Sequence, residues 1–488
     1  MTLLKEALMR TQHFVFAHTK AERKAYGQFF TPSATAAFMA SLFDLPLGEP
    51  CLRILDAGAG SGILSVALVE RLLGEGYTGR IELTCYETDP HILLLLENNL
   101  RLLSNKGVRC TLLVENYITS QPFAAEQALF AADAPAKYDL IIGNPPYKKI
   151  SKDAPEARAM PQVCHGAPNL YALFCAMGIH NLKQGGQLVY IMPRSWTSGA
   201  YFERFRRYML SCCSVSGIHL FGSRDKVFSS EQVLQETMIV RLGKGSEQPS
   251  EVVVSSSASS DFSDMAHFSV PYETLVGANG YIYLVTDERE GETLARINRM
   301  TGSLPANGTP MKTGIIVDFR TPDVLRSEAA EPDTYPLFYA QHIQKGRVKW
   351  PVGKDGEYIH TTHTAHLQAN ANYLFVKRFT SKEEPRRLQC GIYLSEDYPQ
   401  YPFISTQNKL NFIKCHDKDE AFGLYVLLNS TLYDTYYRIL NGSTQVNSTE
   451  INHMPIPHAD TIKQMGRQLQ GMALSQENCD KILEQWTN

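Results

Sequence analysis

The sequence predicts an α/β fold for the first half of the chain and a mixed, strand-rich fold for the second. Three observations predict the first half: a strand that runs into a glycine-rich turn, a second strand that ends in acidic residues, and a third that ends in two prolines. Strands that alternate with helices in this way are typical of a parallel sheet. We place a first domain at residues 1–245, a crossover region at 246–305 and a second domain at 306–488.

The glycine-rich turn is the first element that carries chemistry. Residues 53–56 form a short strand pattern, residues 57–62 contain the turn, and residues 63–71 have helical character. Strand, glycine turn and helix make up the first half of a nucleotide-binding unit, in which glycines let a ligand approach the backbone. The next strand, residues 82–86, ends at Glu87. An acidic side chain about 20 residues beyond the glycines is placed to accept hydrogen bonds from ribose hydroxyls.

The same segment indicates which nucleoside ligand to expect. A dinucleotide-binding fingerprint has more glycines at the start of its helix, and no pyrophosphate cradle is evident here. Asp56, at the end of the first strand, suits a ligand that carries an ammonium group. These features favour S-adenosylmethionine over a nicotinamide cofactor.

The tetrad Asn144-Pro145-Pro146-Tyr147 directly follows the apolar strand pattern of residues 138–143. The Asn144 side-chain oxygen and the carbonyl of Pro145 can each accept a hydrogen bond from an amino group whose lone pair is delocalised. Both bonds draw the nitrogen toward tetrahedral geometry and stabilise the transition state of its methylation. Tyr147 offers a face for stacking a planar group. The alternative is a proline-bearing turn that merely ends a strand.

In the order of its motifs the chain resembles the gamma-class N6-adenine DNA methyltransferases, the TaqI-methyltransferase type of bacterial restriction–modification systems. The matching segments are residues 27–32, the turn around Asp56 and Gly58, Glu87, the Asn144 tetrad, and residues 169–174, 185–193, 227–228 and 233–239. The resemblance implies a Rossmann-like, S-adenosylmethionine-dependent methyltransferase domain. It also implies that Tyr147 and Phe228 sandwich a flipped-out adenine.

The resemblance extends to the residues that hold the cofactor, which would be Thr31, Asp56, Gly58, Glu87 and Phe174. One position departs from the family pattern. After the third strand the family usually has an aspartate that accepts the cofactor's amino group, and here the stretch is Glu115-Asn116-Tyr117. Either Asn116 makes this contact with a neutral amide, or the register differs by one residue.

The second half resembles modification methylases of the PstI and BsuBI sort in residues 313–320, 377–379 and 443–450. This resemblance implies a DNA target-recognition domain and a short palindromic site such as CTGCAG, with its adenine methylated. In the last segment Thr444, Gln445 and Asn447 either read base edges or are solvated loop residues.

Basic residues form local clusters in this chain, although its net charge is slightly negative. The formal net charge of −3 does not indicate a polyanion-binding protein, although phosphate binding depends on local basicity. The basic clusters predicted to contact DNA contain Lys148, Lys149, Lys377, Arg378, Arg386 and Arg387.

Composition predicts a cytoplasmic protein. No apolar run is long enough to span a bilayer, and the N-terminus lacks the pattern of a signal peptide. The ten cysteines include no Cys-x-x-Cys pair, so we predict reduced thiols, no disulfides and no metal site. Nothing resembles a nuclease's acidic cluster, so a cognate restriction endonuclease would be a separate protein, and we expect a monomer.

Direct methyl transfer to a flipped base is the expected mechanism, without a covalent enzyme intermediate. The rival interpretations keep the tetrad but change the substrate. They are a glutamine side chain of a translation release factor, a guanine amino group in RNA, and N4 of cytosine. A binding module without activity is a further alternative.

Overall fold

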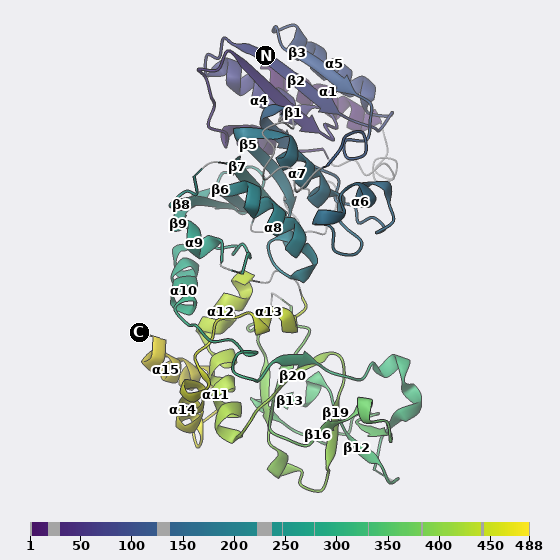
Figure 1. Ribbon diagram of the computed structural model, residues 1–488, viewed down its shortest axis with the longest axis vertical. Coiled ribbons are helices and arrows are strands. Elements are labelled where there is room, and N and C mark those ends of the chain that lie inside the picture. Colours follow the sequence, from purple (N-terminus) through teal and green to yellow (C-terminus); the bar gives the residue numbers. More distant parts are fainter. Residues whose placement is uncertain are drawn as a thin grey trace. The chain divides into compact units, whose positions relative to one another are not determined.

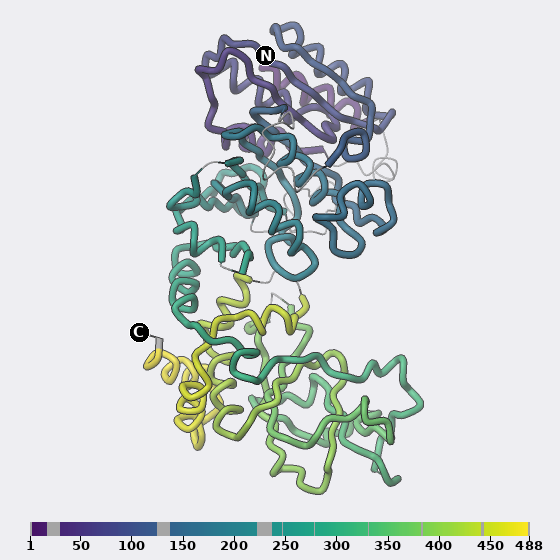
Figure 2. The backbone as a smooth tube through the Cα atoms, viewed as in Figure 1, coloured from purple at the N-terminus to yellow at the C-terminus, as the bar shows by residue number. Residues whose placement is uncertain are grey.

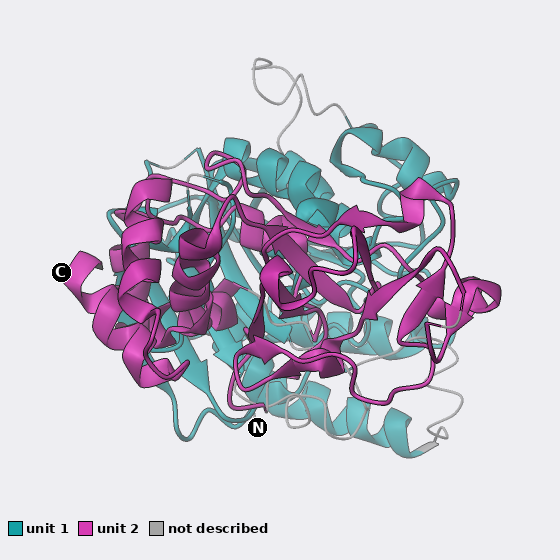
Figure 3. Cartoon of the chain, turned by 90° about the horizontal axis from the view of Figure 1, so that it is seen from below, with its two compact units in different colours: residues 1–287 teal, residues 288–488 magenta. Residues whose placement is uncertain are grey.

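The computed structural model describes residues 2–17, 30–123, 137–221, 237–245, 247–277, 279–329, 331–381, 384–440 and 444–487. The chain divides into two compact units, residues 1–287 and 288–488 (Figure 3). The division falls within the predicted crossover region, and part of that region, residues 251–271, belongs to the sheet of unit 1.

Unit 1 is built around one large sheet in which the strand order is β3-β2-β1-β4-β5-β7-β6-β8-β9 (Figure 1). Strands β1 to β5 are parallel, β7 is antiparallel to both β5 and β6, β8 is parallel to β6, and β9 is antiparallel to β8. The strands are β1 Cys51–Ala57, β2 Arg80–Tyr86, β3 Arg109–Leu113, β4 Tyr138–Gly143, β5 Leu182–Pro193, β6 Cys213–Phe221, β7 Thr237–Lys244, β8 Glu251–Ser257 and β9 Ala266–Pro271. The Rossmann-like α/β fold predicted for this half is confirmed.

Helices connect and cover these strands. They are α1 Leu3–Ala17, α3 Ser33–Ser41, α4 Ile63–Gly74, α5 Leu93–Ser104, α6 Pro155–Ala159, α7 Leu170–Asn181, α8 Glu203–Cys212 and α9 Tyr272–Leu275. Helices α1, α3, α4 and α5 pack against one another and share a hydrophobic core with one face of β1 and β2. Helices α7 and α8 pack together, and α7 also packs on β5.

The order of the sheet places two loops side by side. Strand order runs in one direction from β1 to β3 and in the other from β4 to β5, so β1 and β4 flank the point of reversal. Their register pairs Ile54 with Leu140 and Leu55 with Ile141. Extended by three residues, this parallel register brings Gly58 level with Asn144. Ligands of open α/β sheets bind at the carboxyl ends of strands at such a reversal.

Unit 2 contains two smaller sheets and a C-terminal group of helices, whose backbone runs from green to yellow in Figure 2. Its sheets have the orders β10-β20-β17-β18-β14-β13 and β11-β15-β12-β19-β16. The strands are β10 Met311–Thr313, β11 Leu325–Arg326, β12 Thr334–Phe338, β13 Ile343–Gln344, β14 Arg347–Val348, β15 Tyr358–His360, β16 Gln368–Ala369, β17 Tyr373–Lys377, β18 Cys390–Tyr393, β19 Phe403–Thr406 and β20 Leu410–Lys414. The helices are α10 Glu288–Asn298, α11 Lys418–Asn429, α12 Thr431–Leu440, α13 Ser448–Asn452, α14 Ala459–Leu469 and α15 Gln476–Thr487.

Aromatic side chains fill the core of unit 2, where Phe338, Trp350 and Tyr393 pack together. The strands are short and the clear helices lie toward the end of the chain, as the sequence predicted. Within the described ranges of both units, no helix combines the length and the apolar character that crossing a membrane requires.

Candidate active site

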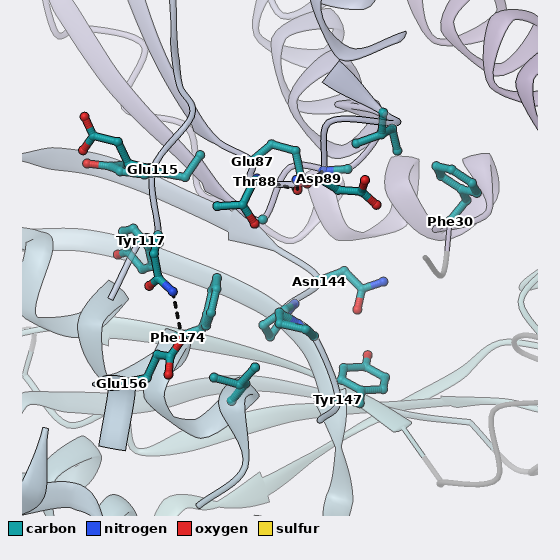
Figure 4. A pocket seen from close by; sticks show the side chains of 18 residues that line it. Phe30, Glu87, Thr88, Asp89, Glu115, Tyr117, Asn144, Tyr147, Glu156 and Phe174 are labelled. Atoms are coloured by element: carbon teal, nitrogen blue, oxygen red, sulfur yellow. Dashed lines mark hydrogen bonds between the residues drawn. The ribbon is translucent and has the colours of Figure 1, made fainter. Parts of the chain in front are cut away.

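A cavity of about 330 Å³ lies where the loops after β1, β2, β3 and β4 meet (Figure 4). It is lined by the glycine turn, the segment after β2, the segment after β3, the tetrad and two helices. The lining residues are Phe30, Gly58, Gly60, Tyr86, Glu87, Thr88, Asp89, Ile92, Glu115, Asn116, Tyr117, Asn144, Pro145, Pro146, Tyr147, Glu156, Leu170 and Phe174. The two predicted sites, the glycine turn and the tetrad, therefore share one cavity.

The glycine turn has a backbone that only glycine adopts easily. Gly58 and Gly60 have φ values of 70° and 56°, in the left-handed region. A Cβ atom on Gly58 would also meet the Phe174 ring at 3.5 Å. The amide N–H groups of Gly58 and Ala59 both donate to the carbonyl of Tyr86, at 2.8 and 2.9 Å, which ties the turn to the end of β2.

Glu87 is fixed at the edge of the cavity by backbone donors. Its Oε2 accepts from the Gly60 N–H at 2.9 Å, and its Oε1 accepts from the N–H groups of Thr88 and Asp89 at 2.7 and 2.9 Å. An ionised carboxylate has about four acceptor sites, so one remains for a further donor. Glu87 therefore lies where the sequence predicted, with the capacity to accept a hydroxyl hydrogen bond.

Asp56 does not lie where the prediction put it. Its side chain is 0% exposed and is absent from the cavity lining. Its Oδ2 accepts from the Ser65 hydroxyl on α4 at 2.7 Å, and its Oδ1 has no hydrogen-bond partner. Burial raises the pKa of Asp56 to about 7. Because β1 is covered on both faces, the last carboxyl of the strand points into the core beneath the turn, and we do not retain it as a ligand for an ammonium group.

Asn116 lines the cavity, but its carboxamide oxygen is already engaged. That oxygen accepts from the N–H groups of Ile118 and Thr119, at 3.0 and 3.1 Å. The Nδ2 of Asn116 donates to Oε1 of Glu156 on α6, at 2.8 Å (Figure 4). The next side chain, Tyr117, is buried and lies against Phe174, with 5.4 Å between the ring centroids.

The tetrad presents its polar and aromatic groups to the same cavity. Figure 4 shows the side chains of Asn144 and Tyr147 next to one another. Nδ2 of Asn144 donates to the hydroxyl of Thr31 at 3.1 Å. The Tyr147 hydroxyl donates to the carbonyl of Ile191 at 3.1 Å, and the Tyr147 ring meets Tyr171 edge-on. Burial raises the pKa of Tyr147 well above its ordinary value, so the phenol stays neutral and keeps its proton for the bond to Ile191.

One predicted cofactor-binding residue, Thr31, is not among the residues that line the cavity. Thr31 is 6% exposed and contacts Asn144, and it does not itself line the cavity, whereas its neighbour Phe30 does. Phe228 lies outside the described residues.

The predicted DNA-contacting residues form three pairs along the sequence. Lys148 and Lys149 are exposed directly after the tetrad, and the ammonium of Lys149 lies 5.2 Å from the centre of the Tyr201 ring. Lys377 and Arg378 are half-buried in unit 2, where Lys377 donates to Gln389 and Arg378 donates to the carbonyl of Asn408.

Arg386 and Arg387 have structural positions instead. The Arg386 guanidinium donates to the carbonyls of Leu428 and Ser430 at the end of α11. Arg387 is 0% exposed, and its Nε donates to the hydroxyl of Thr380. The buried guanidinium of Arg387 cannot reach a phosphate, so Arg387 is removed from the predicted DNA contacts, whereas the half-buried Arg386 stays a prediction.

Sequence reasoning missed several lining residues. Phe30 and Asp89 lie inside motifs that had been recognised, and proximity to those motifs was a usable signal. Glu156 had no such signal, because it lies on a five-residue helix without periodicity.

The chain is similar in sequence to several known methyltransferases. A family model described as the Eco57I restriction-modification methylase matches residues 80–228. The type II methyltransferase M.PstI of Providencia stuartii is 36% identical over 480 residues, which cover 95% of this chain and 93% of that protein. The type II methyltransferase M.BsuBI of Bacillus subtilis is 34% identical over 454 residues, which cover 90% of this chain and 89% of that protein. The chain belongs to this family of type II methyltransferases.

Membership makes the chain a site-specific DNA methyltransferase of the restriction–modification type, and S-adenosylmethionine is its methyl donor. The predicted family resemblance is thereby confirmed. Among solved structures, a nuclease-deletion mutant of the type ISP restriction-modification enzyme LlaGI, in complex with a DNA substrate mimic, is similar with a TM-score of 0.53 and 12% identity. The similarity covers 91% of this chain and 54% of the nuclease-deletion mutant, and it concerns the fold alone.

Proposed function

We propose that this type II methyltransferase transfers a methyl group to N6 of an adenine that is flipped out of duplex DNA. The modification protects a specific site from a cognate restriction endonuclease, which is a separate protein. The observation that carries this proposal is the carboxamide of Asn144 at the rim of the cavity, beside the glycine turn. An oxygen acceptor held there suits an exocyclic amino group, and the asparagine that opens the tetrad favours adenine N6 over cytosine N4.

The residues of the cavity fit the expected methyl donor. Glu87 has acceptor capacity for a ribose hydroxyl, the Gly58 backbone is open to close approach, and the ring of Phe174 offers an apolar face. S-adenosylmethionine, when bound, supplies an electrophilic methyl group on a sulfonium. We assign cofactor binding to Gly58, Glu87 and Phe174, with Asn116 acting through its hydrogen bond to Glu156.

The chain's own residues prepare the amino group for attack. The Oδ1 of Asn144 and the carbonyl of Pro145 each accept one N–H bond, while the ring of Tyr147 stacks on the base. Pro145 and Pro146 restrict the backbone, so the two acceptors need little reorganisation when charge develops on the nitrogen. Phe228 is the proposed second aromatic of the base sandwich. The attacking nitrogen becomes cationic and loses its proton afterwards, so no strong base is needed.

DNA binding relies on exposed lysines directly after the tetrad and on half-buried cations in unit 2. We assign phosphate contacts to Lys148 and Lys149 and retain Lys377 and Arg378 as further contacts. Adenine cannot reach the cavity while it is stacked, so Lys148 and Lys149 would hold the strand beside the extruded nucleotide.

Plasmid DNA isolated from cells that express the chain tests the proposal. Digestion of that DNA to nucleosides and mass spectrometry should reveal N6-methyladenine, and sequencing that detects modified bases should place it at one recurring motif. DNA from cells that express Asn144→Ala is the matched control and should lack the mark. N4-methylcytosine in its place would contradict the assigned base.

The same cells also test the rival substrate, a glutamine side chain of a release factor. Unmodified DNA together with a newly methylated release factor would support the rival. The extensive identity to M.PstI and M.BsuBI, which spans both units, supports a DNA substrate.

A further inference from the structure

Asn116 cannot serve as the main acceptor for a nucleobase amino group. Both backbone N–H groups that point at its Oδ1 come from its own turn, from Ile118 and Thr119. The remaining polar atom, Nδ2, is a donor, and it is directed at Glu156. An amino group that approached this side chain would meet an oxygen whose lone pairs are already shared and a nitrogen that repels it.

Glu156 supplies the acceptor that Asn116 lacks. It belongs to α6, which follows the tetrad, and it lines the same cavity. The Asn116 amide fixes one carboxylate oxygen, Oε1, at 2.8 Å. A carboxylate has about four acceptor sites, so Glu156 can take a second donor while it keeps this bond.

Asn116 holds Glu156 against the segment after β3, and Glu87 belongs to the segment after β2. Strands β2 and β3 are parallel neighbours, paired from Glu82 with Arg109 to Tyr86 with Leu113, so the segments after them emerge side by side. Figure 4 shows Glu87 and Glu156 with the ring of Phe174 between them. With its ribose at Glu87, the cofactor would have its base along Phe174 and the far edge of that base toward Glu156.

We infer that Glu156 binds the exocyclic amino group of the cofactor's adenine ring and that Asn116 is the positioning residue for this carboxylate. The inference rests on the proposed binding of S-adenosylmethionine in this cavity. Asp153, in the loop before α6, is an exposed carboxylate that does not line the cavity. It therefore provides a matched control with the same change of charge.

Calorimetry on the full-length protein tests the inference with two ligands. S-adenosylhomocysteine carries the amino group, and S-inosylhomocysteine carries an oxygen in its place, which cannot donate. We expect Glu156→Gln to weaken S-adenosylhomocysteine binding about tenfold or more, because a hydrogen bond to a charged acceptor is lost. Binding of S-inosylhomocysteine should not weaken, so the preference of the protein for adenosine should fall.

Asp153→Asn should leave both affinities and the preference unchanged. Equal weakening of both ligands by Glu156→Gln, or no effect on either, would overturn the role of Glu156 while leaving the proposed function intact. Failure of the unaltered protein to bind S-adenosylhomocysteine at all would overturn the proposed function itself. Circular dichroism melting of each variant separates loss of binding from loss of folding.

Discussion

At the scale of single residues, the proposed chemistry depends on one carboxamide oxygen. We expect Asn144→Ala to lower the rate of methyl transfer by at least about 100-fold, because one preorganised group that stabilises developing charge is removed. Cofactor affinity should change little, since the base and ribose ends of the cavity remain intact. Single-turnover methylation and calorimetry with S-adenosylhomocysteine measure the two quantities. A parallel loss of both would indicate a folding defect and remove the catalytic assignment.

Thr31 controls the orientation of that carboxamide. Its hydroxyl accepts from Nδ2 of Asn144 at 3.1 Å, which leaves the oxygen end of the amide for the substrate. We expect Thr31→Val to lower kcat about fivefold, the worth of a typical hydrogen bond of about 1 kcal/mol, with little change in the KM for S-adenosylmethionine. Thr31→Ser keeps the hydroxyl and should retain most of the activity. A rise in KM without a fall in kcat would instead support direct contact of Thr31 with the cofactor.

Asp56 makes the stability of unit 1 depend on pH. Its pKa is raised by burial from 3.8 to about 7, so between these values the folded state binds more protons than the unfolded state. Stability must therefore fall as pH rises through this range, by at most about 1.4 kcal/mol per pH unit, and level off above about pH 7. Asp56→Asn can keep the hydrogen bond from Ser65 and cannot ionise.

Thermal melting from pH 4.5 to pH 8 measures this effect as a difference between two proteins. We expect the Tm of Asp56→Asn, relative to that of the unaltered chain, to increase as pH rises toward 7. A difference that does not vary with pH would mean that Asp56 is ionised in the folded state throughout the range.

At the scale of elements, the strands and turns that build the site were predictable because their signals are local. The glycine turn requires positive φ values, and the tetrad follows an apolar strand. Residues 57–62 and 144–147 could therefore be recognised from their immediate sequence neighbours. The direction of Asp56 could not, because β1 is buried on both faces and its side chains carry no inward–outward alternation. The burial of Arg387 could not be predicted either, because it depends on distant parts of the chain. The Asp434 carboxylate that accepts its backbone N–H bond lies 47 residues away, on α12.

The packing of α11 on α14 depends on glycines that leave no room for a side chain. A Cβ atom on Gly423 would lie 1.9 Å from the carbonyl oxygen of Ile462, which is backbone and cannot rotate away. We expect Gly423→Ala to destabilise unit 2 by several kcal/mol, although alanine favours a helix over glycine by about 1 kcal/mol. Gly291 on α10 has nothing within 4 Å of the same position.

Gly291→Ala is therefore the matched control for helix propensity alone. It should raise stability by about 0.5 to 1 kcal/mol, whereas Gly423→Ala should lower it. Urea denaturation of both variants measures the two effects with opposite signs. Stabilisation by Gly423→Ala would show that the two helices do not approach as closely as described.

At the scale of the whole molecule, the candidate site combines residues that lie far apart in the sequence. The cavity joins loops that follow four different strands, and Glu156 reaches it from a short helix that no periodic pattern marks. The order of the sheet determines which loops meet, and that order depends on strand pairing over long sequence distances. Motifs at strand ends could therefore be predicted as members of one site, and the side chains that support them could not.

The charge of the molecule leads to a final prediction, because a chain with a net charge of −3 must bind DNA through a few local cations. The logarithm of the affinity falls linearly with the logarithm of salt concentration, with a slope of about 0.9 per neutralised phosphate. We expect Lys148→Ala and Lys149→Ala each to weaken binding to all duplexes alike and to reduce that slope by about one. Lys418→Ala, which removes an exposed lysine paired with Glu396, is the control and should leave the slope unchanged. Fluorescence anisotropy over a range of salt concentrations gives these slopes, and weaker binding with an unaltered slope would show that neither lysine contacts a phosphate.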